Sequence, residues 1–214
     1  MDILLVAATE MEIKEFILTG LSETNHTIDL LITGIGMPLT IFHLTKQLSQ
    51  KKYDLVIQAG IAGTFNNKYK TGSVVIVEKE FFGEIGVEEK DEFKTIFEKG
   101  LADGNIFPFE DGFINNENEL LEEIDLPKVC GVTINRISDS KSQMQFYKMR
   151  FNADVESMEG SGLHLVCKSM NQPFIQLRSI SNEVGERDKA KWDMKGALKN
   201  LNKELLKVVN HLSK

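Results

Sequence analysis

The sequence predicts an α/β fold in a single domain that spans residues 1–214. Short apolar runs rich in Val, Ile and Leu alternate along the chain with amphipathic segments, and this alternation is typical of strands and helices packed in layers. A chain of 214 residues is long enough to bury one sizeable core and does not require a second domain. We find no internal repeat and no low-complexity segment that would divide it.

Six apolar runs are expected to form buried strands, at residues 2–8, 27–36, 53–63, 72–82, 128–134 and 173–181. A first helix is expected from Thr9, which can cap it with Glu12 at the capping-box position. Four more helices are expected at 38–49, 140–150, 159–170 and 195–213, the last with leucines and valines at helical spacing. Between residues 83 and 126 acidic residues and glycines predict irregular excursions inside the domain.

Charge and composition exclude several classes of function. Lys and Arg number 25 against 32 Asp and Glu, and the net charge of −7 argues against a nucleic-acid partner. The N-terminal stretch has no basic region, and Glu10 and Glu12 interrupt its apolar run, so neither a signal peptide nor a membrane span is predicted. A cytoplasmic location without a membrane partner is therefore expected.

The cysteines and the one histidine in a predicted core helix are interpreted as structural. Cys130 and Cys167 lie far apart in apolar runs without a CxxC spacing, which predicts reduced core residues. His164 shares the helical pattern of Cys167 and is expected to be a packed histidine. No metal site is predicted.

Four polar or glycine-containing stretches follow predicted strands, at residues 7–12, 34–38, 59–65 and 178–185. Ligands of open α/β sheets bind where strands end, so these stretches are the candidates for a site. Each also has a purely structural interpretation. The glycines permit tight turns, Glu12 serves a capping box, and Asn182 is a common turn residue. Glu159, outside these stretches at the opening of a predicted helix, suits a helix N-terminus.

Taken in order, the motifs "AATEME", "GIG", "DLVIQAGIAGTF", "GSVVIVEKEF", "VESMEGSGLHLVC" and "PFIQLRSISN" resemble those of the purine nucleoside phosphorylase and nucleosidase superfamily. The resemblance covers nearly the whole chain. It implies a nucleoside phosphorylase-like fold in three layers, with a central mixed β-sheet flanked by helices. It also implies a homodimer that cleaves the N-glycosidic bond of a small-molecule nucleoside substrate, with neither cofactor nor metal.

The resemblance also implies roles for individual residues. Cleavage through an oxocarbenium-like sugar needs an activated nucleophile, charge stabilisation on the sugar and support for the leaving base. Glu12 matches the acid/base glutamate that activates water, and Asn182 would receive the base as the second catalytic residue. The substrate-binding residues would be Glu159 on the ribose hydroxyls, Met158 against the sugar, and Ala62, Gly63 and Ser181.

The residue at position 182 bears on the choice of base. Superfamily members that cleave adenine nucleosides carry an aspartate there, which can donate to purine N7 and accept from the 6-amino group. The NH2 group of Asn182 offers only donors, which suit N7 and the 6-oxo group of hypoxanthine. We therefore expect a 6-oxopurine nucleoside. Nearby, Arg178 is interpreted as structural or as holding the loop, and Trp192 either covers the base or simply packs.

Water is expected as the nucleophile, because phosphate requires positive charge and the first arginine of the chain is Arg136. Ile61 also stands where relatives often carry a hydroxyl residue. Lys14 could supply positive charge for phosphate, so a phosphorylase remains an alternative. The alternatives are thus another purine nucleosidase of the methylthioadenosine/S-adenosylhomocysteine type, an inosine phosphorylase, and a non-catalytic nucleoside-binding module. Residues 133–137 and 91–113 are candidates for the far parts of the pocket without an assigned role.

Overall fold

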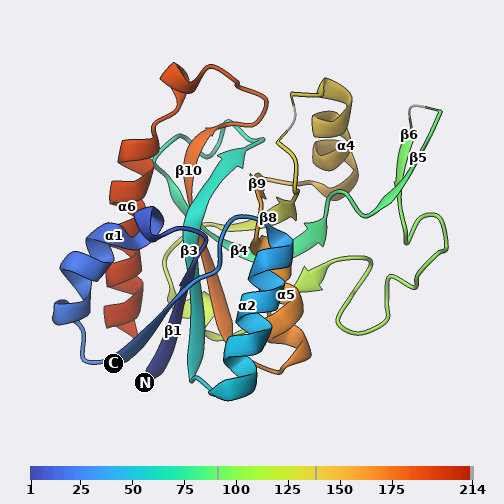
Figure 1. Ribbon diagram of the computed structural model, residues 1–214. Coiled ribbons are helices and arrows are strands. Elements are labelled where there is room, and N and C mark those ends of the chain that lie inside the picture. Colours follow the sequence, from blue (N-terminus) through green and yellow to red (C-terminus); the bar gives the residue numbers. More distant parts are fainter. Residues whose placement is uncertain (91, 138, 213–214) are drawn as a thin grey trace.

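The computed structural model describes residues 1–90, 92–137 and 139–212. Its strands are β1 Asp2–Ala7, β2 Thr27–Ile32, β3 Leu55–Thr64, β4 Val74–Phe82, β5 Gly86–Glu89, β6 Glu92–Thr95, β7 Ile114–Asn115, β8 Lys128–Thr133, β9 Val155–Ser157 and β10 Phe174–Glu183. Its α-helices are α1 Glu10–Leu18, α2 Met37–Gln50, α3 Leu120–Glu123, α4 Lys141–Phe151, α5 Gly160–Ser169 and α6 Met194–His211, with 3-10 turns at Gly20–Glu23 and Lys189–Lys191. Figure 1 shows the helices around a central sheet.

The central sheet is mixed, as predicted. Its strand order is β10-β4-β8-β9-β3-β1-β2, and β10 also pairs with β3, so part of the sheet curls into a closed ring. β3 is parallel to β1 and β10 but antiparallel to β9, and β10 is antiparallel to β4. The carboxyl ends of β1, β3 and β10 therefore meet at one edge, which is where loops gather to form sites in such sheets.

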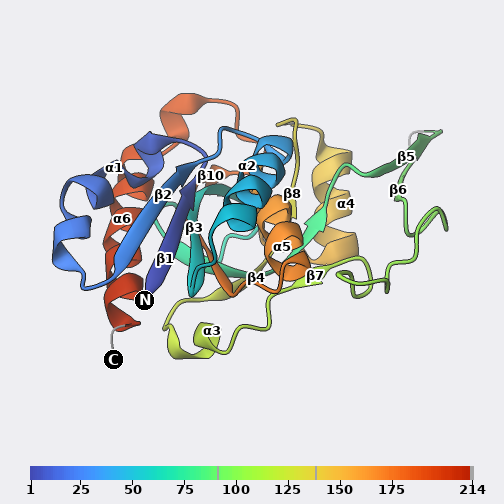
Figure 2. The same ribbon diagram turned by 60° about the horizontal axis from the view of Figure 1, so that its bottom comes forward.

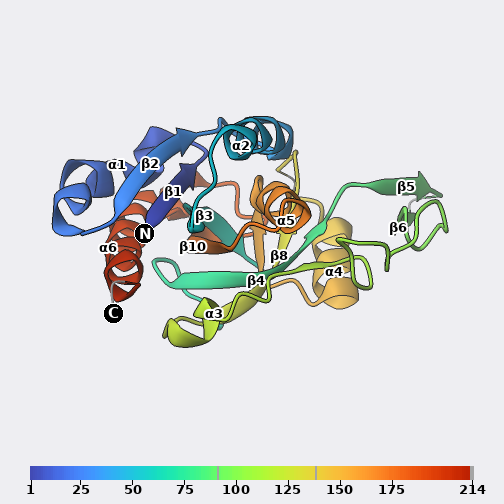
Figure 3. The same ribbon diagram turned by 90° about the horizontal axis from the view of Figure 1, so that it is seen from below.

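Strand β1 illustrates why helices cover both faces of the sheet. Its side chains alternate between the two faces, as the period of a strand requires. Ile3 and Leu5 belong to an apolar cluster with residues of α1 and α6, whereas Leu4 and Val6 belong to a cluster with residues of α2 and α5. Figure 3 shows α1 and α6 on one side of β1 and β3, and α2 and α5 on the other. The predicted α/β layering is confirmed.

Two predicted boundaries differ from the structure for local reasons. The strand expected over 27–36 ends at Ile32, because Gly34 and Gly36 have φ angles of 84° and 101° that a continuing strand does not adopt. The segment 83–126, expected to be irregular, contains short elements. β5 and β6 form a hairpin that projects from the body, and β7 and α3 run along its lower side (Figure 2).

The residues interpreted as structural are buried. Cys130 and Cys167 are free and buried, and His164 is fully buried with Nδ1 2.9 Å from the Ile114 carbonyl oxygen. Within residues 1–90, 92–137 and 139–212, no group of three or more His, Cys, Asp or Glu is placed to hold a metal ion. No helix of this described part has the length and apolar composition that a bilayer crossing requires.

Candidate active site

A cavity of about 250 Å³ opens at the sheet edge where β1, β3 and β10 end. All seven residues singled out from the sequence line it, namely Glu12, Ala62, Gly63, Met158, Glu159, Ser181 and Asn182. They come from four separate parts of the chain, and the sheet brings them together. The wall also contains Ile61 and Trp192. Trp192 donates its indole N–H to the Glu186 carbonyl oxygen at 3.0 Å, which fixes it beside the cavity.

Glu12 takes part in a capping box and also faces the cavity. Its Oε2 accepts hydrogen bonds from the backbone N–H and the hydroxyl of Thr9, at 2.9 and 3.1 Å. Its Oε1 accepts from the backbone N–H of Ile61 at 3.3 Å. Only 7% of the residue is exposed, and this burial raises the pKa of its carboxyl although the nearby charge of Arg178 lowers it. The cap thus holds one oxygen and presents the other toward β3.

Glu159 occupies the N-cap position of α5 and also lines the cavity. Its Oε1 accepts a hydrogen bond from the backbone N–H of Gly36 at 3.0 Å, and its Oε2 lies 3.7 Å from Nη2 of Arg178. It is 5% exposed. The loop after β2 and the start of α5 therefore orient this carboxylate together.

Arg178 lies between the two carboxyls. It is 1% exposed and donates from Nη2 to Oε1 of Gln58 at 2.6 Å. A Cβ built on Gly60 would overlap Nη1 of Arg178 and lie 3.0 Å from Oε1 of Glu12, so the guanidinium sits next to both groups. The structural interpretation of Arg178 fits this burial, and its side-chain partners, Gln58 on β3 and Glu159 at the N-cap of α5, lie outside the loop that follows β10. An arginine inside an apolar strand run is itself a signal, since buried charges require partners.

The amide of Asn182 is oriented by its neighbours. Oδ1 accepts the hydroxyl hydrogen of Ser181 at 2.8 Å, and Nδ2 donates to the backbone oxygen of Glu183 at 2.8 Å. One amide hydrogen is used in this way, which leaves the second for a ligand. Ser181 thus acts on the amide as well as lining the cavity.

A buried carboxyl, that of Glu80, accepts a hydrogen bond from the first turn of α5. Glu80 is fully buried and accepts hydrogen bonds from Thr133 Oγ1, Ser161 Oγ and Gln176 Nε2, at 2.9, 3.2 and 2.9 Å. Burial raises its pKa to about 7, although these hydrogen bonds oppose the rise. Because Ser161 follows the N-cap residue Glu159 by two positions, this network fixes the helix start that carries Glu159.

The raised pKa of Glu80 predicts a pH dependence of stability. From its ordinary pKa of 4.5 up to about 7, the folded chain holds a proton that the unfolded chain has lost. The free energy of unfolding therefore falls as pH rises through this range and levels off above it. The Glu80→Gln variant should show a flatter dependence, measured by urea unfolding at pH 5, 6, 7 and 8. Parallel curves for the two proteins would contradict the shift.

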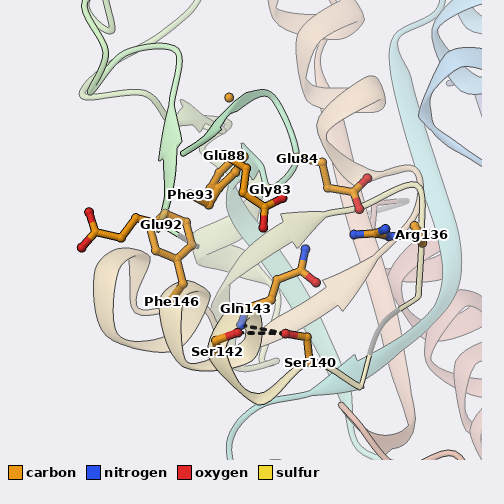
Figure 4. A pocket seen from close by; sticks show the side chains of 11 residues that line it. Gly83, Glu84, Glu88, Glu92, Phe93, Arg136, Ser140, Ser142, Gln143 and Phe146 are labelled. Atoms are coloured by element: carbon orange, nitrogen blue, oxygen red, sulfur yellow. Dashed lines mark hydrogen bonds between the residues drawn. The ribbon is translucent and has the colours of Figure 1, made fainter. Parts of the chain in front are cut away.

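Other sequence candidates lie at or beyond the cavity rim. From 133–137, Ile134 and Ile137 line the cavity, but Arg136 lines a larger neighbouring hollow of about 600 Å³. Figure 4 shows that hollow, with Glu84 and Arg136 at one end. No residue of 92–113 lines the smaller cavity, and exposed Lys14 is not part of its wall. We place the site in the smaller cavity. Of the two, only this cavity is lined by the buried carboxyls of Glu12 and Glu159 and by the oriented amide of Asn182.

The family model described as "Phosphorylase superfamily" matches residues 8–213. The chain belongs to the phosphorylase superfamily. The match includes every strand and helix that contributes a side chain to the cavity wall. The resemblance noted from the sequence motifs is thereby confirmed at the level of the superfamily.

Individual curated proteins are also similar to the chain. It is 28% identical over 171 residues to the futalosine hydrolase of Thermus thermophilus, covering 78% of this chain and 74% of the relative. It is 27% identical over 187 residues to that of Acidothermus cellulolyticus, covering 85% and 76%.

Solved structures of other proteins share the fold. The futalosine hydrolase of Helicobacter pylori superposes with a TM-score of 0.79 at 18% identity, over 97% of this chain and 96% of that chain. The 5'-methylthioadenosine/S-adenosylhomocysteine nucleosidase of S. pneumoniae, with a transition-state inhibitor, superposes with a TM-score of 0.81 at 18% identity, over 99% and 100%. This fold therefore accommodates nucleosidases.

Proposed function

We propose that the chain is a futalosine hydrolase, which cleaves futalosine into hypoxanthine and dehypoxanthine futalosine in menaquinone biosynthesis. The observation that carries this proposal is that two buried carboxyls, Glu12 and Glu159, line the same cavity as an oriented amide, Asn182. Two curated relatives of this name match more than three quarters of the chain. The motifs "GEIGVE" and "SNEVGERDKAKWD" also resemble those of futalosine hydrolases.

The geometry supports a direct hydrolysis. A water molecule attacks the anomeric carbon and gives its proton to Glu12, while the bond from this carbon to the base breaks and its electron pair leaves with the base. Glu159 holds the ribose hydroxyls and Asn182 donates to the departing hypoxanthine. Arg178 lies beside both carboxyls, and its positive charge offsets the repulsion between their negative charges.

Water is a better nucleophile than phosphate for this cavity. Among the described residues that line it, none is a lysine or an arginine. Ile61 contributes an apolar side chain to the wall. A phosphate ion needs several donors and positive charge, and the guanidinium of Arg178 is already engaged by Gln58 and Glu159.

The first test is release of the base from futalosine, inosine and methylthioadenosine, each with and without phosphate, followed by chromatography. We expect release of hypoxanthine from futalosine that does not depend on phosphate. Phosphate-dependent release from inosine would identify a phosphorylase. Adenine released from methylthioadenosine alone would identify the other nucleosidase class, and substrate binding without turnover would identify a binding module.

Exchanging the amide at position 182 should weaken action on 6-oxopurines. The Asn182→Asp variant loses the free amide hydrogen, and loss of one buried hydrogen bond is expected to lower kcat/KM for futalosine at least about tenfold. The Asn171→Asp variant, on an exposed turn outside the cavity, serves as the matched control. Unchanged kinetics for Asn182→Asp would remove the argument for base selection.

The proposal includes a cytoplasmic homodimer. Three apolar side chains, Ile35, Leu39 and Phe42, are exposed near the start of α2, and Ile35 also lines the cavity. A second copy that covers this face would remove apolar surface from water beside the cavity mouth. The two free cysteines, Cys130 and Cys167, suit a reducing compartment. Sedimentation equilibrium tests the dimer, and a monomer at micromolar concentration would contradict it.

A further inference from the structure

Glu80 is a fully buried carboxyl that is not part of the cavity wall but lies against the helix start that carries Glu159. Two glycines make room for it. A Cβ built on Gly160, the residue after Glu159, would overlap Oε1 of Glu80, and a Cβ built on Gly131 would lie 2.5 Å from the same atom. The carboxyl therefore packs directly on the backbone of the first turn of α5.

The hydrogen atoms around this carboxyl indicate that it carries a proton. Oγ of Ser161 lies 2.9 Å from the carbonyl oxygen of Phe81 and 3.2 Å from Oε2 of Glu80, and a hydroxyl has one hydrogen to donate. An ionised Glu80 competes with Phe81 for this hydrogen. A protonated Glu80 donates to Ser161, which then donates to Phe81, so both contacts become hydrogen bonds. The same carboxyl oxygen still accepts from the hydroxyl of Thr133 at 2.9 Å.

The charges around Arg178 favour the same proton. Its guanidinium lies beside Glu12 and Glu159, and its positive charge also acts on Glu80. One cation cannot offset three buried carboxylates, and a buried charge without a partner is strongly destabilising. A proton on Glu80 leaves the guanidinium to the two carboxyls of the cavity.

We propose that Glu80 is a positioning residue that acts in its protonated form, in which its O–H holds the first turn of α5 through Ser161 and its neutrality leaves the charge of Arg178 to the cavity. This inference rests on the proposed function, in which Glu159 holds the ribose hydroxyls. Loss of the proton turns the hydroxyl of Ser161 away from Phe81 and adds a third carboxylate near Arg178. Both changes act on the helix start that orients Glu159, so release of the base slows when Glu80 ionises.

The proton of Glu80 is lost within a pH range in which the enzyme can be assayed. Burial raises the pKa of its carboxyl to about 7, so kcat/KM for futalosine should fall as pH rises through this value. Glu156 lines the cavity, and burial raises the pKa of its carboxyl to about 7 as well. The test must therefore compare a variant with wild type at each pH.

Three elements other than β4 bring titratable or charged groups toward Glu80. On β8, burial raises the pKa of Cys130 to about 12, and on α5, burial lowers the pKa of His164 to about 4, so both are neutral between pH 6 and 9. β10 brings the guanidinium of Arg178, whereas β7, which pairs with β4 at this point, has no titratable side chain. On β4 itself the nearest are two partly exposed residues, Glu78 and Lys79.

The Glu80→Gln variant keeps a neutral group at every pH, because its NH2 donates and its carbonyl accepts. Its kcat/KM for futalosine should lie within about threefold of wild type at pH 6, and the ratio of variant to wild type should rise about tenfold or more by pH 9. Infrared spectra give a readout that needs no substrate. At pH 6 the wild type should show the C=O stretch of a carboxylic acid that is lost at pH 9 and absent from Glu80→Gln. The matched control Glu78→Gln, on the same strand, should keep the band and the wild-type pH profile.

The Ser161→Ala variant tests the direction of the hydrogen bond. If the carboxyl donates to Ser161, loss of this acceptor disfavours the protonated form, and the alkaline fall in kcat/KM should begin at lower pH than in wild type. If Ser161 instead donates to an ionised carboxylate, its loss moves the fall to higher pH, and this result would overturn the proposal.

Two further results would overturn the role of Glu80 and leave the proposed function standing. One is an infrared band at pH 6 that is identical in wild type and Glu80→Gln, and the other is a ratio of kcat/KM that does not change with pH. Wild-type protein that releases no base from futalosine would overturn the proposed function together with the positioning role that rests on it, and the infrared band would still report the proton.

Discussion

Replacing Glu12 with glutamine is expected to lower kcat for futalosine hydrolysis by about 10²–10⁴-fold, which is the usual contribution of a positioned general base. Glutamine cannot accept the proton of water. It can still fill the third position of a capping box, so the hydrogen bond from the Thr9 backbone N–H should survive and the helix start should stay in place. The variant therefore separates proton transfer from folding.

Kinetics and substrate binding should be measured together for Glu12→Gln. Calorimetry on the inactive variant gives its dissociation constant for futalosine. This constant should be close to the KM of the wild-type enzyme if the chemical step is slower than substrate dissociation. The Glu15→Gln variant changes an exposed glutamate on the same helix and should keep full activity. A Glu12→Gln protein that turns over like wild type would exclude Glu12 as the base and revive the non-catalytic interpretation.

Replacing Arg178 with methionine is expected to lower the free energy of unfolding by about 3–5 kcal/mol and to abolish most activity, because it leaves buried carboxyls without their cation. Glu159 is 5% exposed and would lose the guanidinium 3.7 Å away. Glu12 would also lose the charge that opposes the burial-driven rise in the pKa of its carboxyl. A smaller fraction of Glu12 would then be ionised at neutral pH.

A double-mutant cycle tests this account of Arg178. Adding Glu159→Gln to Arg178→Met removes one unpaired charge, so the pair should be less destabilising than the sum of the two single changes. Arg187→Met, at an exposed arginine of the following loop, should alter neither stability nor activity. Additive effects of the two buried substitutions would show that the ion pair contributes nothing to stability.

The periodic features of the fold could be predicted from the sequence because they depend on local spacing. The alternation of side chains in β1 identifies a strand, and the helical spacing of apolar residues in α6 identifies a helix. Neither pattern depends on residues elsewhere in the chain. Glu12 could likewise be predicted at a helix start, since a capping box involves residues only three positions apart. The strand end at Ile32 was harder to place, because the backbone conformation of Gly34 and Gly36 depends on the loop that reaches Glu159.

What only the tertiary structure decided is the pairing of groups far apart in the chain. The sequence by itself indicated which side chains follow strands or begin helices, and the resemblance of its motifs to the superfamily brought Glu12, Glu159 and Asn182 forward as candidates. It did not determine that Arg178 lies beside both carboxyls, or that Glu80 lies against the helix start that carries Glu159. Those placements follow from the register among β3, β4, β8 and β10, and a shift of one residue in any of these pairings would turn the side chain to the opposite face.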